Sequence, residues 1–337
     1  MAAMEIAIKI GTSYTSVYLS GAGVVLHEPS VVAFVGEGEK KKVIAVGREA
    51  KSMRGVAPDR TTVVSPVIDG YVTDVEACTL MMTEFIKKIL PVSYLLFPKI
   101  KALLVVPTGL SVQERKIYTD IVLKSGVADV TMVDNSIATA LGFDLPIETP
   151  AGGLVANIGG GITEISIVSM CGTVTGCSVS VGGNMMDKAL IDYCIGKYGF
   201  KIGAETARKA KEEIASLYPN DVSSIEVRGL NISTMTPAAI TLYATDLYEV
   251  LMPYYGKIAD AIEGITNLCP PEIAAGVHAK GLFVCGGGAK ITGIERVLKP
   301  VLYIPVTVAD DPEFTAIVGA GKLLGNDALM EKIHLQS

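Results

Sequence analysis

The chain has 337 residues, with 29 Lys or Arg against 35 Asp or Glu, so its formal net charge is −6. Half of the residues are apolar and 19% are charged, a composition that excludes a disordered chain, and the length predicts about two domains. The mild acidity argues against a nucleic-acid-binding protein, because contacts to phosphates need a basic surface.

The cysteines and histidines show no pattern typical of a metal site or a disulfide scaffold. The six cysteines are scattered without a CxxC pair, and the three histidines lack the spacing of metal ligands. We therefore expect a reduced, cytoplasmic chain and no metal ion bound by these residues. The sequence also lacks a signal segment and an apolar stretch of about 18 residues, so no membrane span is predicted.

The first half of the chain begins with a predicted β-hairpin. Residues 6–20, IAIKIGTSYTSVYLS, read as strand, small-residue turn and alternating strand. Residues 102–106 form an apolar run typical of a buried strand. Residues 111–124 predict a helix that starts at Ser111, with Glu114 at the capping-box position. Residues 146–153 hold two prolines and two glycines, and predict the linker between the halves.

The second half repeats the opening pattern. Residues 154–169, LVANIGGGITEISIVS, align with the first hairpin, so that Gly159 falls on Gly11. The repeat indicates a duplicated domain. Further on, the sequence predicts a helix capped by Asn184 and three other elements. These are helices over residues 205–217 and 241–268, the latter stopped by prolines 270 and 271, and a buried strand over 281–285 that ends at three glycines.

Three glycine turns follow buried strands, at residues 11–15, 159–163 and 286–288. Glycine lets backbone N–H groups approach an anion closely, because no Cβ intervenes. Each turn taken alone could be an ordinary tight turn. Two of them related by duplication, and facing each other across a cleft between domains, would instead hold a polyphosphate from both sides.

These turns and the motifs around them resemble the MreB group of bacterial actins, in the superfamily of actin, heat-shock chaperone ATPases and sugar kinases. The matching segments are VVLHEPSVVAF (24–34), AVGREAKSM (45–53), SPVIDGYVTD (65–74), VVPTGLSVQER (105–115), VGGNMMD (181–187), CGGGAKITG (285–293) and ADDPEFTAIVGAGKLL (309–324). The resemblance implies a duplicated α/β actin-like fold. Each of its two lobes has a core subdomain and a smaller inserted subdomain, with a nucleotide cleft between the lobes.

The resemblance also implies where the subdomains and the nucleotide contacts lie. Subdomain IA would comprise residues 1–33, 66–145 and 315–337, IB 34–65, IIA 146–181 and 246–314, and IIB 182–245. The first phosphate loop would comprise Gly11, Thr12, Ser13, Tyr14 and Thr15, and the second Gly159, Gly160, Gly161, Ile162 and Thr163. The adenine-side loop would comprise Gly286, Gly287 and Gly288, with Arg208 and Lys211 at nucleoside-contacting positions.

The chain departs from the family pattern at the positions that carry chemistry. Lys9 and Asn157 replace two aspartates that help hold hydrated Mg²⁺, and Asn135 replaces the water-orienting glutamate. Tyr14, Ile162 and Arg208 replace an asparagine, a threonine and a glutamate. Carboxylates normally anchor Mg²⁺, and asparagine cannot take up a proton near neutral pH. We therefore expect ATP or ADP binding, with Mg²⁺ weakly held or absent and ATP hydrolysis weak or absent.

Lys9 lies between Ile8 and Ile10 in a strand expected to be buried on both faces. An unpaired ammonium there would cost several kcal/mol or lose its proton. In one interpretation Lys9 contacts the phosphates and supplies the positive charge of the absent Mg²⁺. In the other it pairs with Asp134 or another acid and closes a cleft that no longer binds nucleotide.

The resemblance further implies a membrane-contacting loop, at Leu95, Leu96 and Phe97 with lysines on both sides. Buried in lipid, three such side chains would contribute about 5 kcal/mol, although they could also pack into their own lobe. The implied partners are other copies of the chain in protofilaments, the inner membrane surface, where the chain would be peripheral, and envelope-synthesis membrane proteins.

The function predicted from these features is a nucleotide-binding, membrane-associated cytoskeletal filament that organises cell shape or envelope synthesis. A pseudoenzyme scaffold with an empty or non-hydrolysing cleft is the first alternative. A small-molecule kinase is the second, and it would need Asp187 or Glu164 as its base.

Overall fold

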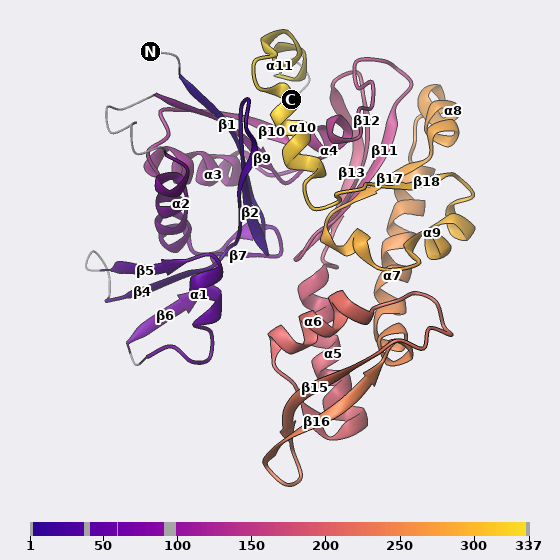
Figure 1. Ribbon diagram of the computed structural model, residues 1–337. Coiled ribbons are helices and arrows are strands. Elements are labelled where there is room, and N and C mark those ends of the chain that lie inside the picture. The colour runs from indigo at the N-terminus through magenta and orange to yellow at the C-terminus, as the bar shows by residue number, and fades with distance from the viewer. Residues whose placement is uncertain (1–2, 37–40, 59, 91–98, 335–337) are drawn as a thin grey trace.

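The computed structural model describes residues 3–36, 41–58, 60–90 and 99–334. Two lobes lie side by side, and each contains a five-stranded sheet (Figure 1). The apolar core comes from the sheets, whose central strands are buried on both faces, and from the helices that pack on them.

The sheet of the first lobe has the strand order β10-β9-β1-β2-β3. Its strands are β1 (Met4–Ile10), β2 (Tyr14–Leu19), β3 (Gly23–Pro29), β9 (Ile100–Val106) and β10 (Asp129–Asp134). Strands β1, β2 and β3 form an antiparallel meander, whereas β9 and β10 run parallel to β1. The predicted hairpin and the predicted buried strand are both confirmed.

The sheet of the second lobe has the order β13-β12-β11-β17-β18, with the same pattern of parallel and antiparallel neighbours. Its strands are β11 (Gly153–Ile158), β12 (Thr163–Ser169), β13 (Gly172–Val179), β17 (Leu282–Cys285) and β18 (Val306–Val308). Ile158 lies opposite Thr163 in the second hairpin, as Ile10 lies opposite Thr15 in the first. The internal duplication is therefore a duplication of structure, and the predicted actin-like fold class is confirmed.

Helices cover both sheets and join the lobes. The first lobe has α2 (Val75–Ile89), α3 (Val112–Lys124), α4 (Asn135–Gly142), α10 (Thr315–Leu323) and α11 (Asp327–His334), and the second has α7 (Ala244–Asn267), α8 (Pro271–Lys280) and α9 (Ile294–Leu302). One apolar core fills each lobe. A third core, around α4 and α10, contains side chains from both sheets and so connects the lobes.

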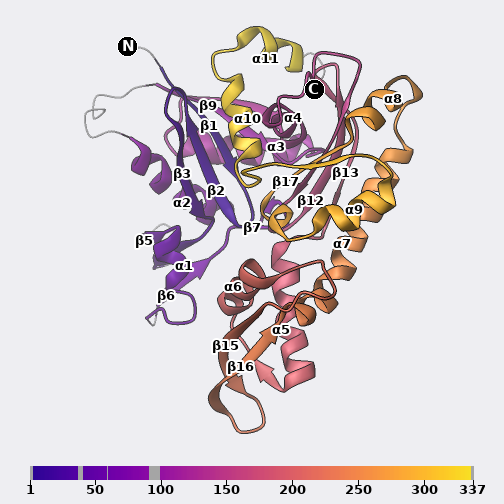
Figure 2. The ribbon, with the colours of Figure 1, turned by 45° about the vertical axis from the view of Figure 1, so that its right-hand side comes forward.

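A smaller sheet extends from each lobe on the same side of the molecule (Figure 2). The first comprises β4 (Val32–Val35), β5 (Lys42–Val46) and β6 (Thr61–Val64), with α1 (Arg48–Ser52) beside it; the short hairpin β7 (Val67–Ile68) and β8 (Tyr71–Val72) follows. The second comprises β14 (Phe200–Lys201), β15 (Ser224–Asn231) and β16 (Thr236–Tyr243), with α5 (Gly183–Tyr198) and α6 (Ala204–Ile214). The four subdomain boundaries given above stay a prediction.

Two local predictions were wrong. Asn184 is not the cap of α5, because Gly182 takes that position and Asn184 lies within the first turn. Residues 241–243 belong to β16 and not to the helix that follows, since their pairing with β15 satisfies their backbone groups. The capping box of Ser111 and Glu114 is present at the start of α3, as predicted.

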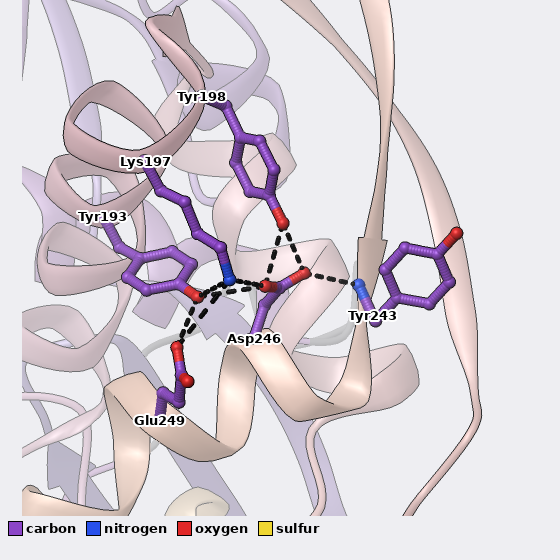
Figure 3. Close-up of polar contacts among 6 residues, drawn as sticks. All are labelled: Tyr193, Lys197, Tyr198, Tyr243, Asp246 and Glu249. Carbon is purple, nitrogen blue, oxygen red and sulfur yellow. Dashed lines mark hydrogen bonds and ion pairs between the residues drawn. The ribbon is translucent and has the colours of Figure 1, made fainter.

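A buried carboxylate fixes α5 against the start of α7 (Figure 3). Asp246 accepts hydrogen bonds from Lys197 at 2.7 Å, from the Tyr193 hydroxyl at 3.0 Å and from the Tyr198 hydroxyl at 2.9 Å. It also accepts one from the backbone N–H of Tyr243 at 3.0 Å. Burial alone would raise the pKa of Asp246, but these donors lower it below its usual value. The cluster is a structural tie between two helices.

Candidate nucleotide site

The first glycine turn connects β1 and β2 and is tightly closed. The N–H of Gly11 donates to the carbonyl of Tyr14 at 3.1 Å, and the Ser30 hydroxyl donates to the carbonyl of Gly11 at 2.6 Å. Thr15 is fully buried and its hydroxyl lies 2.9 Å from that of Ser30. Thr12 accepts a hydrogen bond from the N–H of Gly70 at 2.9 Å, which ties the turn to the loop between β7 and β8.

The second glycine turn connects β11 and β12 in the same way. The N–H of Gly159 donates to the carbonyl of Ile162 at 2.9 Å, matching the bond from Gly11 to Tyr14 in the first turn. The start of α5 supports this turn, because the N–H groups of Gly183 and Asn184 donate to the carbonyls of Gly159 at 3.0 Å and Gly160 at 2.8 Å.

The two turns face each other closely. A Cβ on Gly160 would clash with the side chain of Ser13, and one on Gly161 would lie 2.8 Å from the Cα of Asp69. The backbone N–H groups of these two glycines, and those of Thr12 and Ser13, donate to no other group in the described part of the chain. The two turns that carry these four N–H groups thus lie against each other between the lobes.

Replacing Gly161 by alanine is expected to weaken nucleotide binding at least ~10-fold. The added Cβ would meet backbone atoms of Asp69 at 2.8 and 3.0 Å, so the lobes would have to separate. Equilibrium titration with ADP measures the effect. Gly196→Ala is the matched control, because a Cβ at Gly196 in α5 meets nothing within 4 Å. Equal affinities of the two variants would contradict the predicted role of the turns.

The third glycine turn follows β17 and closes against the second. Gly286 has a φ of 86°, and a Cβ there would lie 2.6 Å from Oδ1 of Asn157. The Tyr255 hydroxyl donates to the carbonyl of Gly288 at 2.7 Å and holds the turn from α7. The third turn therefore packs against the end of β11, the strand that leads into the second turn.

Two of the residues that depart from the family pattern, Asn135 and Asn157, lie between the lobes. Nδ2 of Asn135 donates to Glu164 at 2.5 Å, and Nδ2 of Asn157 lies 3.4 Å from Oδ1 of Asn135. The second oxygen of Glu164 accepts from the N–H of Thr108 at 2.8 Å. Glu164, Asn135 and Asn157 are all buried, so an amide–carboxylate network joins the two lobes.

Lys9 lies beside this network. Its side chain is half-buried, which corrects the expectation of a strand buried on both faces at this residue. Burial lowers the pKa of Lys9, while the nearby Cys285 and Glu164 raise it. Burial raises the pKa of Glu164, and its hydrogen bond from Thr108 and the charge of Lys9 act against that rise. Lys9 and Glu164 thus stabilise each other's charged forms.

The predicted pairing of Lys9 with Asp134 was wrong. Asp134 accepts from Arg115 on α3 at 2.6 Å instead, and no carboxylate in the described chain lies within 4 Å of the Lys9 ammonium. Asp134 pairs with Arg115 because α3, which carries Arg115, packs beside β10. Glu164 is therefore the carboxylate that acts on the charge of Lys9, without an ion pair between the two.

The nucleoside-side residues Arg208 and Lys211 both contact Asp187. Lys211 lies 2.5 Å from Oδ1 of Asp187 and donates to the carbonyl of Gly183 at 2.7 Å. Arg208 lies 3.3 Å from Oδ2 of Asp187 and donates at 2.8 Å to Asn184, which also accepts from Ser13 at 3.3 Å. These contacts tie α5 and α6 to the first phosphate loop.

Two bulkier replacements, Tyr14 and Ile162, lie in the loops. Tyr14 stacks on His27 with ring centroids 4.5 Å apart, and His27 meets the edge of Phe314 at 4.8 Å. Ile162 packs against Gly70 of the first lobe. A Cβ added to Gly70 would lie 2.6 Å from the Cδ1 atom of Ile162. Ile162 has no polar atom in place of the threonine of the family pattern, and Tyr14 has a phenol hydroxyl in place of the amide of the asparagine.

A pocket opens at the mouth of the cleft, between the two smaller sheets. It is lined by Thr12 and Ser13 of the first loop and by basic side chains from both lobes. Lys51 on α1 and Glu205 on α6 form an ion pair across it at 2.8 Å. Sequence reasoning missed this pocket, because no sequence motif marks the residues that α1 and α6 bring together.

The residues of the cleft do not fit a protein-anchored divalent cation. Among the described residues, no group of three or more His, Cys, Asp or Glu side chains is arranged to hold a metal ion. The positions near the phosphate loops instead carry an ammonium and two amides.

The described residues contain no helix with the length and hydropathy of a membrane span. The predicted membrane residues Leu95, Leu96 and Phe97 lie outside the described residues.

Comparison with known proteins supports the sequence resemblance. Residues 3–332 match the family model described as MreB/Mbl protein. The cell shape-determining protein MreB of Escherichia coli is 36% identical over 323 residues, 95% of this chain and 93% of that protein. Crystal structures of MreB5 of Spiroplasma citri bound to ADP and to AMPPNP each have a TM-score of 0.89. Their sequence identities are 27% and 28%, and they cover 98% and 99% of both chains.

Proposed function

We propose a function from the premise that the chain belongs to the MreB/Mbl family: it is a nucleotide-binding cytoskeletal protein whose filaments organise cell shape or envelope synthesis. The similar proteins are described as cell shape-determining, and two similar structures contain ADP or AMPPNP. The observation that carries nucleotide binding is the close contact of two glycine turns, four of whose N–H groups have no acceptor in the described part of the chain.

The residues present fit a nucleoside di- or triphosphate. The first phosphate loop, residues 11–15, and the second, residues 159–163, would hold the phosphates through backbone N–H groups. The turn at 286–288 and the pair Arg208 and Lys211 would hold the nucleoside. A bound ATP would supply a phosphoanhydride bond, and the chain itself contributes few groups for breaking it.

Hydrolysis is weak or absent in this proposal, because Lys9 and Asn157 stand at the positions of the metal-anchoring aspartates and Asn135 cannot accept a proton. The unpaired ammonium of Lys9 instead compensates phosphate charge from the protein side. Glu164 is not available as a free base, because it accepts hydrogen bonds from Asn135 and Thr108. Family membership leaves the kinase alternative without support.

We also propose that copies of the chain associate head to tail into protofilaments, which bind the inner membrane surface through residues 95–97 and recruit envelope-synthesis membrane proteins. These features follow from the family resemblance. The alternative of a scaffold that polymerises independently of nucleotide is favoured by one observation, the Ser13–Asn184–Arg208 contact, which joins the lobes through side chains of the chain itself.

Electron microscopy of the purified full chain tests the proposal. Filaments that form with ATP or AMPPNP, and that are sparse without nucleotide, are the expected result. Filaments of equal number and length with and without nucleotide would favour the scaffold. Mass spectrometry of the small molecules released by denaturation provides a second readout, and the proposal expects an adenine nucleotide. Failure of ATP and ADP to bind in equilibrium titrations would overturn it.

A further inference from the structure

The pocket at the mouth of the cleft carries more positive than negative charge. Four basic side chains line it, Lys51, Arg54, Lys188 and Arg208, against two acidic ones, Asp187 and Glu205. They come from both lobes: Lys51 and Arg54 lie in and just after α1, and the others lie on α5 and α6. Figure 1 shows these helices facing each other between the two smaller sheets.

Both acids of the pocket already have cationic partners. Glu205 pairs with Lys51 at 2.8 Å, and Asp187 pairs with Lys211 and Arg208. Within the described chain, neither Arg54 nor Lys188 has a carboxylate within 4 Å, and the hydrogen-bond partner of Arg54 is the Ser65 hydroxyl. Two cations therefore remain uncompensated in a concave site.

Charged side chains on both sides of the pocket act on the Arg54 guanidinium. Burial lowers its pKa; Glu205 raises it and Arg208, across the pocket, lowers it again. Two guanidinium groups that repel each other in a partly buried pocket lose free energy unless an anion lies between them. The hydroxyl-bearing residues Thr12 and Ser13 line the same pocket and would add hydrogen-bond donors.

We propose that the mouth pocket binds an anion of the phosphate class, held by Arg54, Lys188 and Arg208. Guanidinium groups bind phosphate oxygens through paired N–H donors, and an ammonium adds a compact charge. The site adjoins the first glycine turn, whose Thr12 and Ser13 line it, but its cationic groups are side chains that follow or lie on α1, α5 and α6. Because its ligands come from both lobes, an anion bound there links the lobes. The anion is either free inorganic phosphate or the phosphate chain of a nucleotide.

Isothermal titration calorimetry of the full chain with inorganic phosphate, at constant ionic strength in chloride buffer, tests this site. The wild-type chain is expected to bind phosphate, and Arg54→Gln and Lys188→Gln are each expected to weaken binding ~10-fold. Arg54→Lys should retain part of the affinity. Lys209→Gln is the matched control, because Lys209 lies on α6 but points to solvent, with 69% of its side chain exposed.

A second variant should act in the opposite direction. Glu205→Gln removes the carboxylate that competes for the pocket's cations and is expected to strengthen phosphate binding about threefold, within the range of a half-exposed ion pair. An intact thermal transition in each variant shows that the fold is retained. Phosphate binding that is absent in the wild-type chain, or unchanged in all of these variants, would overturn the proposal.

Repeating the titration with saturating ADP distinguishes the two sources of the anion. Phosphate that still binds, with the same sensitivity to Arg54→Gln, identifies a separate site for the free ion. Phosphate that is displaced by ADP, together with an equal loss of ADP affinity in Arg54→Gln, identifies the nucleotide's own phosphate chain as the occupant. Neither result depends on hydrolysis.

Discussion

Replacing Lys9 by aspartate, Asn157 by aspartate and Asn135 by glutamate together is expected to raise phosphate release from ATP about 100-fold in the presence of Mg²⁺. The triple variant would regain two carboxylates to anchor the cation and one to orient water. General acid–base groups alone contribute about 10²–10⁴-fold. A continuous phosphate-release assay measures the change against the wild-type chain.

A second readout of the same variant does not depend on turnover. Removal of Mg²⁺ with a chelator is expected to leave nucleotide affinity of the wild-type chain unchanged, because the Lys9 ammonium stays in place. The triple variant should lose affinity at least ~10-fold under the same treatment. Lys9→Met is the control, since it removes the ammonium without adding a carboxylate: it should bind nucleotide more weakly and gain no hydrolysis. Rapid hydrolysis by the wild-type chain would contradict the premise.

Replacing Asp246 by alanine is expected to destabilise the second lobe by about 2–4 kcal/mol. The substitution leaves the Lys197 ammonium, two tyrosine hydroxyls and the Tyr243 N–H without their acceptor (Figure 3). Urea denaturation followed by circular dichroism measures the difference. Glu249→Gln is the matched control, because that side chain is 65% exposed and should change stability by less than ~0.5 kcal/mol.

The same carboxylate gives a pH dependence with a defined sign. Its donors hold the pKa of Asp246 below the unfolded value, so the stabilisation is present at neutral pH and is lost as pH falls through the folded pKa. The difference in stability between the wild-type chain and Asp246→Asn should therefore be largest at neutral pH and shrink below about pH 4. A difference that grows on acidification would contradict this account.

The sequence predicted correctly the turns and the helix start that depend on interactions between residues close together in the chain. The turns at Gly11 and Gly159 follow from small residues between alternating strands, and the start of α3 follows from the capping box of Ser111 and Glu114. The duplication was visible because both hairpins use the same spacing. Asn184 was misplaced as a cap, since a residue that can cap a helix can equally accept bonds from distant side chains, here Ser13 and Arg208.

The sequence by itself determined the family, the duplicated sheets, the three glycine turns and the substitution of acids by Lys9, Asn135 and Asn157, because each is written in contiguous residues. Only the tertiary structure decided that Asp134 pairs with Arg115 and not with Lys9, and that Arg54 and Arg208 line one pocket. Those contacts join segments far apart in the chain. The packing of α1, α3 and α6 determines which charged side chains come into contact. No pattern in neighbouring residues of the sequence predicts that packing.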